Sequence, residues 1–127
     1  MVGSGARRVQ PWVAGLFALG VLVQAFLAGA ALPQLGGSGD FESHKSVGYT
    51  LMGILALAVL IAGGLARSGS VVTWGSVAVF VLYIVQTLLP TFSGSTPVLA
   101  ALHPVNAVVL FGIAAWLFIR GVRPATN

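Results

Sequence analysis

Four long apolar runs fill most of this 127-residue sequence and restrict its folding more than any other feature. They cover residues 12–32, 47–65, 71–89 and 98–119. A helix needs roughly 20 apolar residues to cross the hydrocarbon core of a bilayer. Only 6% of the residues are charged, whereas a soluble domain carries about 25%. The sequence therefore predicts an all-α, polytopic membrane protein whose helices are in contact with the lipid bilayer.

The spacing of the runs predicts one domain over residues 1–127, an antiparallel four-helix transmembrane bundle. The expected helices cover about 12–32, 42–65, 71–90 and 98–120. Residues 1–10 are short, basic and glycine-containing, which predicts a disordered tail. Pro104 leaves two alternatives for the last span: a kink at His103, or a separate short turn over residues 97–102.

The positive charges predict how the bundle is oriented. The arginines lie before the first run, between the second and third, and after the fourth: Arg7, Arg8, Arg67, Arg120 and Arg123. By the positive-inside rule, both termini are expected in the cytoplasm of a multi-pass protein of the cell membrane. His44 and His103 then lie near the outer face. The net charge of +4 is too thinly spread to indicate nucleic-acid binding.

The two halves of the chain resemble each other, which predicts two helical-hairpin repeats. Each half has a Gln near the end of its first helix, a His after the loop, and a small residue four positions later. These residues are Gln24, His44 and Gly48 in the first half, and Gln86, His103 and Ala107 in the second. Both hairpins would have the same membrane orientation, as in transporters built from parallel repeats.

The other polar residues in and near the helices each allow a structural interpretation. Gln24 either donates an interhelical hydrogen bond or contacts a ligand, and Gly20 and Ala28 share its helix face. Asp40 is expected to cap the second helix, with Glu42 in its first turn, because both positions favour acidic side chains.

The two histidines are either interfacial hydrogen bonders or ligands of one shared metal group. A His in or beside a membrane helix is rare and marks a functional site by default. The chain has no Cys, so a closed zinc site would need Asp40 or Glu42 as further ligands. Two imidazoles alone suffice for haem iron, because the porphyrin supplies the other four nitrogens. A flat macrocycle would lie against the next helical turn, where Gly48 and Ala107 leave room.

Two further expectations concern the geometry of such a pair. His44 lies further from Arg67 than His103 does from Arg120. At about 1.5 Å per residue, this predicts a mismatch in depth of roughly 9 Å. The second ring nitrogen of a metal-bound His donates to a nearby acceptor, and Glu42 and Asn106 are the acceptors nearest in sequence.

Residues 42–48 (ESHKSVG) and 102–106 (LHPVN) resemble an uncharacterised family of small four-helix membrane proteins from actinobacteria, a domain of unknown function. More distantly, the layout is similar to one half of haem A synthase. In that family, each four-helix half carries haem-ligating His on its second and fourth helices near the outer face. The resemblance implies haem binding at His44 and His103. Glu42 lies near that family's Glu before the His, at a different spacing.

These observations favour a b-type haem protein for electron transfer or haem handling, with His44 and His103 as axial ligands. Gln24, Tyr83 and Gln86 would line the pocket beside Gly48 and Ala107. The alternative is a structural or accessory subunit of a larger membrane complex without a cofactor. A dimerising transporter half is a third interpretation, disfavoured because no charge lies at mid-membrane. No catalytic residue is assigned, so whether the protein is an enzyme stays open. Gly- and Ala-rich helix faces predict a homodimer.

Overall fold

The computed structural model describes residues 2–123, and all regular secondary structure in that range is helical. The elements are α1 (Val2–Ala31), η1 (Pro33–Leu35), α2 (Glu42–Tyr49), α3 (Leu51–Ala66), α4 (Ser70–Leu88), η2 (Leu89–Phe92), α5 (Pro97–Ala100) and α6 (Leu102–Val122). They form four segments that are long and apolar enough to cross a membrane: Gly3–Ala31, Glu42–Ala66, Ser70–Phe92 and Pro97–Val122. The predicted all-α class with four candidate spans is therefore confirmed.

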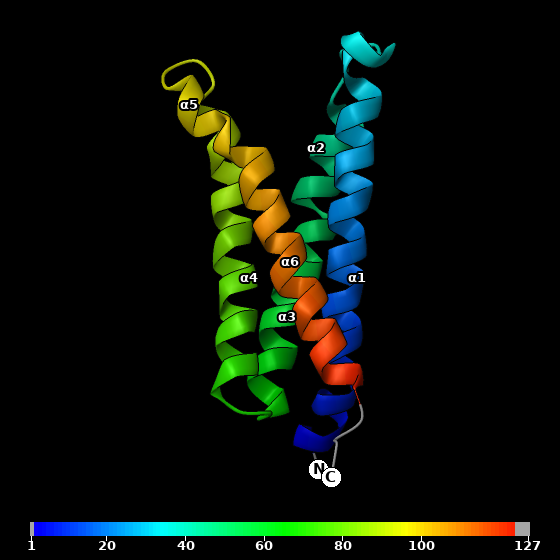
Figure 1. Ribbon diagram of the computed structural model, residues 1–127, viewed down its shortest axis with the longest axis vertical. Helices are drawn as coiled ribbons and strands as arrows, with labels where there is room; N and C mark the ends of the chain where they lie inside the picture. Colours follow the sequence, from blue (N-terminus) through cyan, green and yellow to red (C-terminus); the bar gives the residue numbers. More distant parts are fainter. Residues whose placement is uncertain (1, 124–127) are drawn as a thin grey trace.

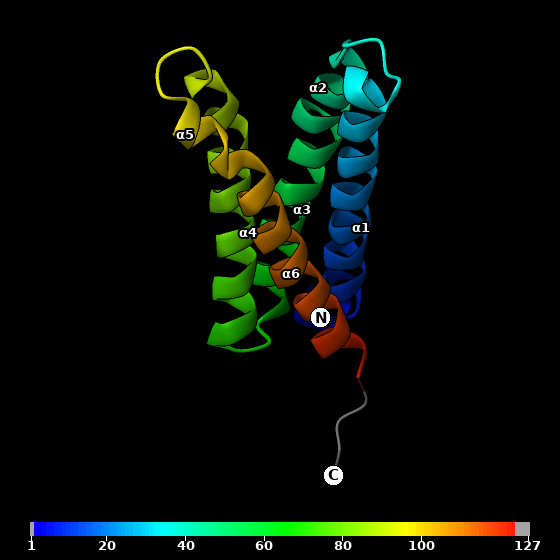
Figure 2. The ribbon, with the colours of Figure 1, turned by 45° about the horizontal axis from the view of Figure 1, so that its top comes forward.

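The four long helices surround one core. α1 packs against α3 and α6, and α4 packs against the same two helices. The start of α1, the turn between α3 and α4 and the end of α6 lie together at the lower end of Figure 1, which we name the arginine end. At the opposite end, the α1–α2 pair splays away from α4 and α5, as Figures 1 and 2 both show.

The core contains both small and large apolar side chains. Phe17, Val59, Val79 and Leu117 are the largest apolar side chains that are fully buried, and Ala14, Ala56 and Ala114 are also inaccessible. Many other long apolar side chains face outward, such as Phe26, Ile54 and Val108, which are 66–71% exposed. An apolar outer surface of this kind suits lipid, because lipid does not penalise exposed hydrocarbon.

The first helix begins at Val2, whereas a disordered tail was expected over residues 1–10. Pro11 lies inside this helix, although proline removes one helical hydrogen bond. Tertiary packing explains the extension. The Pro11 ring lies against Gly121 of α6, so closely that a Cβ at Gly121 would come within 2.5 Å of it. Gln10, beside it, is only 3% exposed.

The second span consists of two helices that meet at Thr50. The Thr50 hydroxyl donates to the carbonyl of Ser46, within its own chain segment, and such bonds compete with regular helical bonding. The Tyr83 hydroxyl of α4 reaches the same joint, 3.1 Å from the Gly48 carbonyl and 3.3 Å from that of Tyr49. A side chain of the second hairpin thus satisfies backbone groups of the first.

The fourth span follows one of the two alternatives left open by Pro104. α5 is a separate short helix, and α6 begins at Leu102. Pro104 therefore lies in the first turn of α6, where backbone N–H groups have no partner within the helix. The proline costs no helical hydrogen bond at this position, and the kink at His103 is unnecessary.

Candidate functional site

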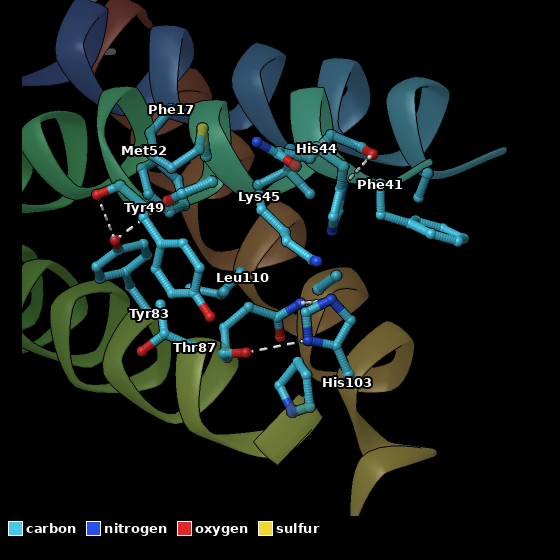
Figure 3. Close-up of a pocket in the computed structure, with 17 residues that line it drawn as sticks. Phe17, Phe41, His44, Lys45, Tyr49, Met52, Tyr83, Thr87, His103 and Leu110 are labelled. Carbon is cyan, nitrogen blue, oxygen red and sulfur yellow. Dashed lines mark hydrogen bonds between the residues drawn. The ribbon is translucent and has the colours of Figure 1, made fainter. Parts of the chain in front are cut away.

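A cavity of about 360 Å³ opens between the two hairpins at the splayed end of the bundle. It is lined by every residue that the sequence marked as a site candidate: Gln24, His44, Gly48, Tyr83, Gln86, His103 and Ala107. They come from α1, α2, α4 and α6. Figure 3 shows the labelled side chains of His44 and His103 pointing toward each other from opposite sides of this cavity.

His44 is held by the helix that precedes it in the chain. Its Nδ1 lies 3.1 Å from the backbone carbonyl oxygen of Gln24. A carbonyl oxygen can only accept, so in a neutral imidazole Nδ1 carries the hydrogen and Nε2 keeps its lone pair. The ring of Phe41 packs edge-on against that of His44, with 6.5 Å between the centroids. These two contacts orient a half-buried ring toward the cavity.

His103 repeats this arrangement in the second hairpin. Its Nδ1 lies 3.0 Å from the backbone carbonyl oxygen of Gln86. Its Nε2 accepts a hydrogen bond from the Gln86 side-chain amide at 3.2 Å. Asn106 holds that amide in place, because its Nδ2 donates to Gln86 Oε1 at 2.7 Å and to the Leu82 carbonyl at 2.9 Å.

The imidazole rings of His44 and His103 lie next to each other. Their centroids are 6.1 Å apart, and their planes are inclined by 72°. The depth mismatch expected from the chain spacing does not separate them, because the second span is jointed at Thr50 and α6 crosses the bundle obliquely (Figures 1 and 2). Residue counting along parallel helix axes ignores both effects.

The expected acceptors for the second ring nitrogens were wrong. Neither Glu42 nor Asn106 contacts a histidine Nδ1; the Gln24 and Gln86 carbonyls take that role. Gln86 is among the last four residues of α4, whose carbonyls have no partner within the helix. Gln24 lies further from the end of α1, and its carbonyl has a second lone pair with which to accept from His44. The cap residue of α2 is Phe41 and not Asp40 as expected, although Asp40 Oδ1 accepts from the Glu42 backbone N–H at 2.8 Å; Glu42 lies in the first turn, as predicted.

Gln24 differs from Gln86 in its side chain. Both Nε2 and Oε1 of Gln24 are buried and have no hydrogen-bond partner among residues 2–123. A Cβ added at Gly48 would lie 3.4 Å from Gln24 Nε2. The interhelical hydrogen bond that Gln24 was expected to donate is therefore not made; its backbone carbonyl accepts one from His44 instead, and the buried side-chain amide is left at the cavity wall.

Several lining residues were missed by the sequence reasoning, among them Phe41, Lys45, Tyr49 and Thr87. Figure 3 shows Lys45 extending from α2 into the cavity. Phe41 could have been predicted to lie beside His44, because it precedes His44 by about one helical turn. Lys45 follows His44 directly, and adjacent residues on a helix point about 100° apart. Its position at the cavity depends on how α2 is rotated, which the sequence does not specify.

Across the part of the chain that the structure describes, no group of three or more His, Asp or Glu side chains could hold a metal ion. A zinc site completed by Asp40 or Glu42 is therefore not formed. The metal chemistry available at the cavity is that of two imidazoles, and the other ligands would have to come from a bound group.

Comparison with known proteins places the chain in a family but assigns it no activity. A family of unknown function (DUF6220) matches residues 24–92, more than half of the chain, so the chain belongs to that family. The matched region contains Gln24, His44, Gly48 and Gln86, and it ends before His103. No curated protein and no solved structure matches the chain.

Proposed function

We propose that this protein is an integral membrane b-type haem protein, ligated by His44 and His103, that serves electron transfer or haem handling. The observation that carries the proposal is the His pair itself. Two imidazoles from different hairpins face one cavity with their ring centroids 6.1 Å apart. In each ring Nδ1 is bonded to a backbone carbonyl, which leaves the lone pair on Nε2; in His103 this lone pair accepts from the Gln86 amide.

The donor chemistry of the two rings fits haem iron. Neutral imidazole nitrogen is an axial ligand of haem in many proteins. A metal-binding His almost always donates its other ring N–H to a carbonyl or carboxylate, which holds the ring and makes the ligating nitrogen more basic. His44 and His103 both have this partner. The same contact in both half-sites is more than two isolated interfacial histidines require.

The walls of the cavity also fit a flat ligand. Gly48 and Ala107, each one turn beyond a His, line the cavity beside apolar side chains such as Phe17 and Leu110. The unpartnered amide of Gln24 is a polar group left for a ligand to satisfy. Before His103 binds a metal, the Gln86 amide has to leave Nε2, whereas His44 Nε2 accepts no hydrogen bond from residues 2–123.

Haem, when bound, would supply one-electron redox chemistry at this position. The chain contributes two oriented nitrogen ligands, a largely apolar wall, and carbonyl groups that hold a hydrogen on Nδ1 of each ring, so that Nε2 carries the lone pair of the neutral imidazole. Apolar surroundings and hydrogen bonding to the ligands are the means by which a protein sets a haem potential.

The orientation and layout of the bundle form part of the same proposal. We place the arginine end in the cytoplasm, because the Arg residues lie in the first turns of α1, at the end of α3 and at the end of α6. The cavity then opens near the outer face of the cell membrane. The two hairpins would derive from one repeat, with His on the second and fourth spans as in one half of haem A synthase. Reporter fusions that locate residues 36–39 in the cytoplasm would contradict this orientation.

A homodimer suits the outer surface of the bundle. Gly29 of α1, Gly64 of α3 and Gly112 of α6 have no neighbouring atoms within 4 Å of an added Cβ, and exposed small residues allow a second helix to approach closely. Native mass spectrometry from several detergents would measure the assembly. A purely monomeric mass in all of them would exclude the dimer.

One visible absorption spectrum tests the haem proposal most directly. The protein is produced with haem supplied during growth and purified in a mild detergent, and the spectra of the oxidised and dithionite-reduced forms are recorded. We expect a Soret band with the sharp reduced bands of low-spin, six-coordinate haem. A preparation without a Soret band, which also fails to bind haem added after purification, would refute the proposal.

A further inference from the structure

Lys45 is the one cationic side chain at the cavity. It is the only lysine of the chain, and it lines the cavity beside His44. Figure 3 shows its amine extending between α2 and the labelled ring of His103. The Arg residues all belong to the start of α1, the α3–α4 turn or the end of α6, away from this cavity.

The Lys45 amine is not neutralised by the protein. Within residues 2–123 it has no hydrogen bond or ion pair, although both acidic residues of the chain lie only a few positions away. Asp40 is engaged with the Glu42 backbone N–H at 2.8 Å. Glu42 lies three residues before Lys45, a spacing that permits an ion pair on a helix, and the two side chains do not form one.

Lys45 is solvent-exposed at the rim of the apolar cavity, and its ammonium group attracts an anionic group on a ligand bound there by charge. Haem b is an apolar macrocycle with two propionate carboxylates on one edge. Lys45 follows His44 directly, so its long side chain could reach a carboxylate at the edge of a macrocycle held between the two histidines, while the macrocycle itself would contact the apolar wall. The distribution of polarity in the cavity therefore matches that of the cofactor.

We infer that Lys45 binds a propionate carboxylate of the haem and thereby sets which edge of the macrocycle faces the outer end. This inference rests on the haem-binding function proposed above. Lys45 acts here as a binding residue for the ligand edge and takes no part in iron ligation.

The test compares haem b with its dimethyl ester, in which both carboxylates are blocked. Apoprotein in detergent is titrated with each compound, and the dissociation constant is read from the Soret band. We expect Lys45→Gln to weaken haem b binding about tenfold, the loss of one charge-assisted hydrogen bond, and to leave the ester's affinity unchanged. Lys45→Arg should keep most of the affinity, and added salt should weaken haem b but not the ester.

Arg67→Gln is the matched control, because it removes the same charge from the turn after α3, away from the cavity. It should change neither affinity. Equal weakening of both compounds by Lys45→Gln, or no weakening of either, would overturn the inference while haem binding itself stands. If the wild-type protein binds neither compound, the proposed function fails and the inference fails with it.

Discussion

The two half-sites of the cavity share one contact and differ in almost everything around it. In each, a histidine Nδ1 donates to the backbone carbonyl of a glutamine in the preceding long helix. In the second half-site, the Gln86 side chain bonds both His103 and Asn106. In the first, the Gln24 side chain bonds nothing among the described residues.

Two sequence differences account for this contrast. Three residues after the histidine, the second hairpin has Asn106 where the first has Val47. Three residues before the glutamine, it has Tyr83 where the first has Val21. Asn106 donates within the second half-site, to Gln86 and Leu82. Tyr83 donates across the bundle to the first hairpin, and the valines can do neither. The comparison teaches that the second half-site is held by its own polar network, whereas the first is held by one carbonyl and by contacts across the bundle.

The largest expected effect comes from removing either histidine. His44→Ala and His103→Ala should each convert a low-spin, six-coordinate haem spectrum to a five-coordinate one or empty the site, because each ring supplies one ligand. Absorption spectra of both purified variants are the measurement, and their elution profiles in detergent are the control for folding. If both spectra are unchanged, the proposal that both histidines ligate haem is refuted. If only one changes, the two half-sites are not equivalent ligands.

The next effect tests the space beside the first glutamine. Gly48→Leu should lower haem affinity about tenfold, since overpacking a filled site costs about 1–3 kcal/mol and a Cβ there already lies 3.4 Å from Gln24 Nε2. Gly5→Leu is the control, because an added Cβ there meets nothing within 4 Å and Gly5 lies at the opposite end of α1 from Gln24. Haem titration gives both values. Equal losses in the two variants would point to a general effect on the helices.

A matched pair of glutamine variants tests the asymmetry directly. Gln86→Leu should cost about 2 kcal/mol of stability without haem, because it removes two side-chain hydrogen bonds and leaves Asn106 with one acceptor fewer. Gln24→Leu should be nearly neutral, because its buried amide has no partner to lose. Unfolding of both apoproteins in the same detergent measures the difference. Equal destabilisation would show that Gln24 has a partner equivalent to that of Gln86.

The smallest effect concerns the contact from the second hairpin to the first. Tyr83→Phe should destabilise the bundle by about 1 kcal/mol, since it removes the hydroxyl that bonds the Gly48 and Tyr49 carbonyls. Tyr49→Phe removes a hydroxyl without a hydrogen-bond partner in the described chain and should have no effect. The same unfolding measurement compares the two. A neutral Tyr83→Phe would mean that the joint at Thr50 is stable without the cross-bundle contact.

Much of the architecture could be predicted because it depends on local composition. Apolar runs of membrane-spanning length specify four helices wherever they pack, and the arginines alone place His44 and His103 toward the same end. The small residues one turn after each histidine, Gly48 and Ala107, could be identified from the sequence in the same way. The candidate site residues could be named for this reason, and all of them line one cavity.

The sequence by itself thus determined the helical class, the four spans and the set of residues that could meet. Only the tertiary structure decided how they meet, because that depends on helix crossing and rotation. It placed the glutamine carbonyls, rather than Glu42 or Asn106, against the imidazoles. It extended α1 to Val2, because Pro11 packs on Gly121. Lys45 also lines the cavity. Its direction depends on the rotation of α2, which contacts with residues distant in the sequence determine.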